Sequence, residues 1–140
     1  MQPRERGLIG LIEDDLVVGG TLAQRLELEG YTSLWWRTGR EALDGLKTAR
    51  PDLVICDIVL PDMSGEDVFL QALWRLGGTP FLFVTALGRI EQAVRLTKAG
   101  AVDYLVKPYA LTDLLERVAR LIGLQPEERW RSARRRRCSG

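Results

Sequence analysis

A chain of 140 residues with 46% hydrophobic and 28% charged residues has the length of one domain and the composition of an ordinary globular protein. It contains no histidine, which excludes Ser-His-Asp and Cys-His catalysis, histidine-ligated metals and a phosphohistidine made on this chain. Its two cysteines are too few for a disulfide framework. No apolar run approaches the length of a membrane span, and residues 1–6 lack the apolar region of a signal peptide, so we expect no membrane partner and a cytoplasmic location.

The formal net charge of +1 is unevenly distributed. Residues 126–140 carry six arginines against two glutamates, and the rest of the chain is mildly acidic. Because the apolar periodicity stops at Gln125, we predict one domain over residues 1–124 and a basic linker or disordered tail over residues 125–140. The arginine run at 134–137 could contact nucleic-acid phosphates, although a solvated linker end is the simpler interpretation.

Apolar segments and amphipathic segments alternate along the domain. The chain order predicts a strand, then a helix, five times over, with strands at 7–12, 31–36, 53–56, 80–84 and 102–106 and helices at 16–29, 38–49, 64–76, 89–99 and 111–122. The spacing Thr38-x-x-Glu41 is that of a capping box. Strict alternation of this kind predicts an α/β fold, with a doubly wound five-stranded parallel sheet and helices on both faces.

Chemically active side chains follow four of the five predicted strands. Glu13 and Asp14 come after the first strand, Asp57 after the third, Thr85 after the fourth and Lys107 after the fifth. In an open parallel sheet these ends meet at one edge, where α/β proteins place their sites. Each residue alone is readily explained as a helix cap or a solvated charge, but all five together predict a functional site.

Three neighbouring carboxylates repel one another and raise one another's pKa. Mg2+ is a hard cation that binds carboxylate oxygens and phosphates, and the Lys107 amine supplies a second positive charge. The chemistry therefore indicates a site that handles phosphoryl groups, with Asp57 as an in-line nucleophile forming an acyl phosphate. The Thr85 hydroxyl can donate a hydrogen bond to the new phosphate.

These residues stand in motifs that resemble the receiver domain of two-component response regulators, over residues 7–123. The matching pieces are Glu13-Asp14-Asp15, Asp57 with the following Leu-Pro-Asp-Met-Ser-Gly loop at 60–65, Thr85-Ala86, and Asp103-Tyr104-Leu105-Val106-Lys107-Pro108. The resemblance implies a flavodoxin-like (βα)5 fold. It also implies a signalling switch, not a turnover enzyme, whose partner is a sensor histidine kinase or histidine phosphotransfer protein.

The resemblance assigns a role to each site residue. Asp57 would accept the phosphoryl group, and Glu13, Asp14, Asp57 and the backbone carbonyl of Val59 would bind Mg2+, or Mn2+ in its place. Lys107 would be aimed at the site by a cis peptide bond before Pro108. Thr85 and Tyr104 would act as the switch.

The switch would change the surface formed by the helix at 89–99, the strand at 102–106 and the last helix. Asp103, Asp113 and Arg117 fit a family subgroup that dimerises through this surface, whereas Ala93 and Val102 stand where that subgroup usually carries charges. We therefore treat a homodimer through this surface as possible only.

Two departures from the family pattern concern the phosphate. Val59 and Leu87 are aliphatic where polar side chains can orient an attacking water, so we predict slow self-dephosphorylation.

Three other interpretations remain open. The chain is either a stand-alone receiver or the receiver fragment of a longer DNA-binding transcriptional regulator, since no output module is visible. A flavodoxin-like flavin-binding protein would need a Ser/Thr/Gly-rich phosphate loop after the first strand. An aspartate-based phosphatase of the haloacid dehalogenase type would need a second Asp at the position of Val59.

Overall fold

The computed structural model describes residues 6–101 and 103–123 and contains a single sheet of five parallel strands. In chain order the strands are β1 (Leu8–Ile12), β2 (Thr32–Trp36), β3 (Leu53–Asp57), β4 (Phe81–Thr85) and β5 (Asp103–Val106). Their order across the sheet is β2-β1-β3-β4-β5. This confirms the predicted doubly wound α/β fold. The strand order reverses between β1 and β3, which is where such sheets open a crevice for a site.

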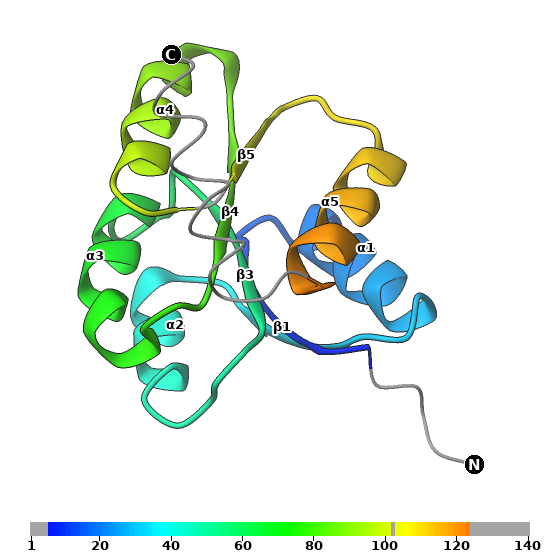
Figure 1. Ribbon diagram of the computed structural model, residues 1–140. Helices are drawn as coiled ribbons and strands as arrows, with labels where there is room; N and C mark the ends of the chain where they lie inside the picture. The colour runs from blue at the N-terminus through cyan, green and yellow to red at the C-terminus, as the bar shows by residue number, and fades with distance from the viewer. Residues whose placement is uncertain (1–5, 102, 124–140) are drawn as a thin grey trace.

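Five α-helices cover the two faces of the sheet. They are α1 (Leu16–Leu28), α2 (Gly39–Gly45), α3 (Gly65–Leu76), α4 (Ile90–Lys98) and α5 (Leu111–Gly123). Figure 1 shows α1 and α5 on one face and α2, α3 and α4 on the other. Among the described residues, no helix has the length and apolar character needed to cross a bilayer.

The central strands are buried on both faces. Every residue of β3 and of β4 is buried, which explains their uninterrupted apolar sequences. On the α3 side of the sheet, the ring of Phe69 packs edge-to-face on those of Phe81 and Phe83, with centroids 5.0 and 5.9 Å apart. Aromatic pairs in this geometry add to the free energy gained by burial. The strand that carries Asp57 is thus buried between the two helical layers.

Element boundaries differ from the predicted ones mainly in the second helix. We predicted α2 to continue to Ala49, but it ends at Gly45 and continues as hydrogen-bonded turns. Glycine is a poor helix former, which fits a helix end at Gly45, and a Cβ there would lie 2.5 Å from the indole of Trp36, so only glycine fits beside that ring. Half of the predicted capping box is present, because the Thr38 hydroxyl accepts a hydrogen bond from the Glu41 backbone N–H at 3.0 Å. The Glu41 carboxylate accepts from the Arg37 N–H at 3.0 Å, one residue before the cap residue.

The remaining differences are small. A 3₁₀ turn at Leu87–Arg89 precedes α4, where we predicted a continuous helix from residue 89. Val102, predicted as the first residue of the fifth strand, lies outside the described residues, as does the basic segment at 125–140 with its arginine run.

Candidate functional site

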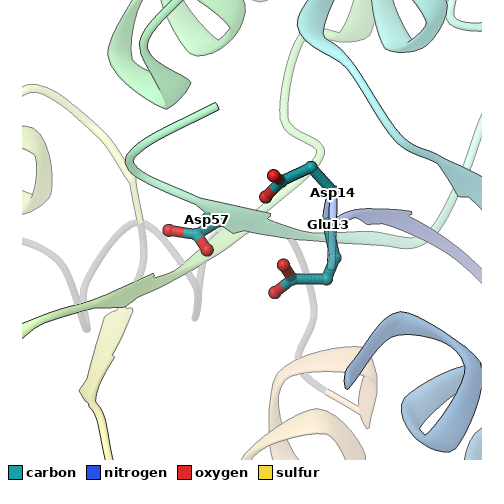
Figure 2. A group of neighbouring side chains, drawn as sticks. All are labelled: Glu13, Asp14 and Asp57. Carbon is teal, nitrogen blue, oxygen red and sulfur yellow. The ribbon is translucent and has the colours of Figure 1, made fainter. Parts of the chain in front are cut away.

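Three carboxylates meet at the carboxyl ends of β1 and β3. Asp57 is the last residue of β3, and Glu13 and Asp14 follow β1 directly. One oxygen from each carboxylate can be chosen so that all three lie within 4.8 Å of one another. Figure 2 shows the side chains of Glu13 and Asp14 extending from the end of β1 towards Asp57. Glu13 and Asp57 are buried and Asp14 is exposed, so the cluster is open to solvent on the Asp14 side.

An ammonium group partly neutralises this cluster. Lys107 follows β5, and its Nζ lies 2.9 Å from Asp57 Oδ2 and 4.0 Å from Glu13 Oε1. The peptide bond between Lys107 and Pro108 is cis, as expected. Burial alone would lower the Lys107 pKa, but the hydrogen bond to Asp57 and the charges of Asp57 and Glu13 raise it. Lys107 is therefore fully protonated near neutral pH.

Glu13 is held in an unfavourable electrostatic environment. Burial raises its pKa, as do the charges of Asp57 and Asp14, while the backbone N–H of Asp15 and the charge of Lys107 oppose this. Its Oε2 accepts the hydrogen bond from the Asp15 N–H at 3.0 Å. The Asp15 carboxylate is used elsewhere, because it caps α1 by accepting from the N–H groups of Val17 and Val18. This agrees with treating Asp15 as a helix-start charge and not as a ligand.

Thr85 ends β4, the strand next to β3, and Tyr104 lies on β5, the strand beyond it. Thr85 is fully buried, and its hydroxyl donates to the carbonyl of Ala86 at 3.1 Å. Tyr104 is half-buried and packs against the core under α2, α3 and α4. The end of β5 is tied to β4 by the Lys107 N–H, which donates to the Thr85 carbonyl at 2.7 Å.

Two surface depressions adjoin the site. A mostly apolar groove of about 600 Å3 runs between α1 and the segment after β5, and its lining includes Val17, Val18, Lys107, Pro108 and Tyr109. A smaller pocket of about 190 Å3 lies between the loop after β3 and the start of α4. Its lining includes Val59, Arg89 and Gln92.

The loop after β3 is fixed against the strand end by short contacts. The Val59 N–H donates to Asp57 Oδ1 at 3.2 Å, and the Val59 side chain is 51% exposed. A Cβ at Gly65 would overlap the backbone oxygen of Asp57 and lie 3.0 Å from Cys56 Sγ. Only glycine allows the start of α3 to approach Asp57 this closely.

Comparison with known proteins identifies this arrangement. The family model of the response regulator receiver domain matches residues 9–119. The chain belongs to this family. Among curated proteins, this receiver domain is 41% identical over 110 residues to the swarming motility regulation protein RssB of Serratia marcescens, covering 77% of this chain and 49% of RssB. It is 37% identical over 114 residues to the transcriptional regulatory protein QseB of Escherichia coli O157:H7, covering 80% of this chain and 51% of QseB. The chain thus spans about half the length of the curated relatives it matches.

Solved structures show the same fold. The receiver domain of HemR from Leptospira biflexa, in its non-phosphorylated form, superposes with a TM-score of 0.76 at 36% identity, covering 84% of this chain and 95% of that one. A CheY-like receiver domain protein from Methanospirillum hungatei superposes with a TM-score of 0.78 at 30% identity, covering 89% and 96%.

The structure brings together four of the predicted site residues, namely Glu13, Asp14, Asp57 and Lys107. Thr85 ends the adjacent strand β4, with its hydroxyl turned to the Ala86 carbonyl. The roles assigned to all of these residues, to Tyr104 and to the Val59 carbonyl stay predictions. The side chain of Leu87 lies outside the described residues.

Sequence reasoning missed the residues that support the site. Gly65 is one of them, and Asp62 is another. The Asp62 carboxylate accepts hydrogen bonds from the N–H groups of Gly39 and Arg40, both at 2.9 Å, and so joins the loop after β3 to the start of α2. Burial acts to raise the Asp62 pKa, but these two N–H groups, together with the Asp62 backbone N–H and the charge of Arg40, lower it. No local pattern in the sequence indicates a contact between residues so far apart.

Proposed function

We propose that this receiver domain is a phosphorylation-activated switch in which Asp57 accepts a phosphoryl group from a sensor histidine kinase or a histidine phosphotransfer protein. One observation carries the proposal. The Asp57 carboxylate ends a fully buried strand, hydrogen-bonded to the Lys107 ammonium at 2.9 Å and clustered with Glu13 and Asp14. A nucleophile, a cation and a pair of acidic ligands are the parts that phosphoryl transfer requires.

The transfer is a single displacement at phosphorus. An oxygen of the Asp57 carboxylate attacks the phosphorus atom, and the bond from phosphorus to the donor's imidazole nitrogen breaks, with the electron pair leaving on that nitrogen. The product is an acyl phosphate on Asp57. Lys107, which now pairs with Asp57 Oδ2, would then pair with an oxygen of the phosphoryl group, because that group carries more negative charge than the carboxylate did.

The acidic cluster has the donors that Mg2+ prefers. The oxygens of Glu13, Asp14 and Asp57 that lie within 4.8 Å of one another are hard carboxylate ligands, which Mg2+ binds together with waters and phosphate oxygens. The backbone carbonyl of Val59 is a further proposed ligand, and Mn2+ is a proposed substitute. The bound cation would neutralise charge on the carboxylates and on the incoming phosphoryl oxygens.

The proposed switch starts at Thr85. Its hydroxyl now donates to the Ala86 carbonyl and would exchange that acceptor for a phosphoryl oxygen, because hydrogen bonds to charged acceptors are stronger. Tyr104, on the neighbouring strand, would change its packing in response. The affected surface would be that of α4, β5 and α5, where Arg117 Nη1 donates to Asp103 Oδ2 at 2.7 Å and to the Tyr104 carbonyl at 3.1 Å.

Two kinds of partner fit the molecule. The donor protein must place its phosphohistidine at Asp57, and the apolar groove beside Lys107 borders that approach; Leu16 and Val17, at the start of α1, expose 59% and 76% of their surface next to it. The aligned region covers 51% of QseB, a transcriptional regulatory protein. We therefore propose that the output is transcriptional and that the protein acts in the cytoplasm. A homodimer through α4, β5 and α5 is a separate proposal, because Asp103, Asp113 and Arg117 fit it and Ala93 and Val102 do not.

Labelling with a small-molecule acyl phosphate tests this function. Wild-type protein should incorporate about one phosphoryl group per chain when Mg2+ is present and none when it is chelated. Asp57→Asn should incorporate none. Asp52→Asn is the matched control, because Asp52 stands at the opposite end of β3, where its carboxylate accepts from the Leu8 N–H. This variant should label normally. No label on the wild type, or equal label on Asp57→Asn, contradicts the proposal.

A further inference from the structure

The backbone of the acidic pair is held from the end of β2. The Glu13 N–H donates to the Trp36 carbonyl at 3.0 Å, which continues the sheet ladder. The Glu13 carbonyl accepts from the indole N–H of Trp35 at 2.8 Å, and the Asp14 carbonyl accepts from Arg37 at 3.4 Å. Three consecutive residues, two at the end of β2 and the one that follows it, therefore each contact one backbone group of the acidic pair.

The indole contact matters most for Asp14. The described part of the chain contains no hydrogen-bond donor to the exposed Asp14 carboxylate, so its direction depends on the backbone that carries it. The Glu13 carbonyl and the Asp14 N–H belong to one planar peptide unit. Rotating that unit would turn the Cα–Cβ bond of Asp14 away from Asp57. A donor fixed on the Glu13 carbonyl opposes this rotation.

The indole of Trp35 packs directly on the backbone of Gly19 in α1. A Cβ at Gly19 would overlap the Trp35 ring and lie 2.7 Å from its Nε1, whereas a Cβ at Gly20 would make only ordinary contact at 3.9 Å. Glycine inside a helix costs about 1 kcal/mol relative to alanine, and α1 contains two in succession. The close packing of the Trp35 ring thus explains a glycine at position 19, because only glycine allows the indole to reach the Glu13 carbonyl.

We propose that Trp35 is a positioning residue for the cation site. Its indole N–H fixes the Glu13–Asp14 peptide unit and so aims the two carboxylates at Asp57. This rests on the proposed function, because it assumes that the three carboxylates bind a divalent cation. It differs from a packing role, in which only the aromatic ring of Trp35 would matter.

Two substitutions break the contact independently. Trp35→Phe removes the N–H and keeps an aromatic ring; Gly19→Ala keeps the tryptophan and displaces its ring. Each has a matched control. Trp36→Phe changes an indole that packs over Gly10 and Gly45 while preserving the backbone carbonyl that binds Glu13. Gly20→Ala adds the same methyl group to α1 where space exists.

The first measurement is the Mg2+ dissociation constant by titration calorimetry at a temperature where urea unfolding shows all variants to be folded. Losing one hydrogen bond should weaken Mg2+ binding roughly two- to tenfold in Trp35→Phe and in Gly19→Ala. Trp36→Phe and Gly20→Ala should bind as wild type does. Wild-type affinity in both Trp35→Phe and Gly19→Ala overturns the proposal, as does equal weakening in all four variants.

The second measurement follows the indole N–H groups by nuclear magnetic resonance. The signal that disappears in Trp35→Phe should be slow to exchange with solvent and should shift most when Mg2+ is added; that of Trp74, which is 93% exposed, should exchange fast and stay in place. If the wild type binds Mg2+ but the Trp35 signal does not shift, the role proposed for Trp35 is contradicted while the proposed function is not. Absence of Mg2+ binding by the wild type overturns the proposed function as well.

Discussion

Replacing Lys107 by methionine tests how the acidic cluster is tolerated in the folded protein. With an effective dielectric constant of about 20, the attraction of Lys107 Nζ is about 6 kcal/mol for Asp57 at 2.9 Å and about 4 kcal/mol for Glu13 at 4.0 Å. The lysine side chain is 37% exposed, so desolvation and screening offset most of this. We expect Lys107→Met to lower the free energy of unfolding by about 2 kcal/mol in Mg2+-free buffer, between the values for exposed and buried pairs.

Saturating Mg2+ should recover most of this loss, because a bound cation stabilises the folded state and here replaces the missing positive charge. The measurement is urea unfolding with a chelator and with Mg2+. The control is Lys47→Met, whose partner Asp44 lies 3.4 Å away with both side chains mostly exposed; it should change stability by less than about 0.5 kcal/mol, with or without Mg2+. Equal stability of Lys107→Met and wild type in chelator, or a loss that Mg2+ does not change, would refute the reasoning.

Three further outcomes are expected. Gly65→Ala should destabilise the domain by about 1–3 kcal/mol and slow phosphoryl uptake, since its Cβ would overlap the Asp57 carbonyl; Gly78→Ala, whose Cβ meets nothing within 4 Å, should do neither. Val59→Asn should speed loss of the phosphoryl group from a lifetime that we expect to exceed seconds in the wild type, followed by release of inorganic phosphate. Burial and the charge of Asp57 raise the Glu13 pKa above 4.5, so stability contributed by protonated Glu13 is present below that pH and lost as the pH rises through the folded-state pKa. Glu13→Gln should accordingly gain stability relative to wild type between pH 4.5 and neutrality in Mg2+-free urea unfolding, and a constant difference would contradict this.

The layered fold could be predicted from the sequence because its strongest signals are local. The segments that form β3 and β4 are buried on both faces. Their sequences are therefore uninterrupted apolar runs, which predict buried strands of a parallel sheet. Helix ends were less predictable. The prediction continued the second helix to Ala49 because the inward spacing of Leu46 and Ala49 suits a helix. The helix instead ends at Gly45, a poor helix former.

The positions of the site residues could be predicted from the sequence, but the contacts that support them could not. Glu13, Asp14, Asp57 and Lys107 could be placed at one edge because each directly follows a strand, and parallel strands end together. The contacts that support them have no such signature. The Trp35 indole N–H contacts a carbonyl 22 residues away in the sequence. The sequence feature related to this contact is the pair Gly19-Gly20, which lowers helix stability and which the packing of the Trp35 ring on Gly19 explains.

The geometry of β5 indicates how a change at Asp57 would reach a distant surface. Lys107, directly after the strand, pairs with Asp57, while Asp103, at its first residue, accepts from Arg117 and Arg120 of α5 at 2.7 and 3.3 Å. Tyr104 lies between Asp103 and Lys107 in the chain, and its carbonyl accepts a hydrogen bond from Arg117. A strand of four residues thus has the proposed site at one end and charged contacts with α5 at the other. Because Lys107 would have to follow the phosphoryl group, and because its backbone N–H is bound to the Thr85 carbonyl, a shift at the site would move β4 and β5 together against α5.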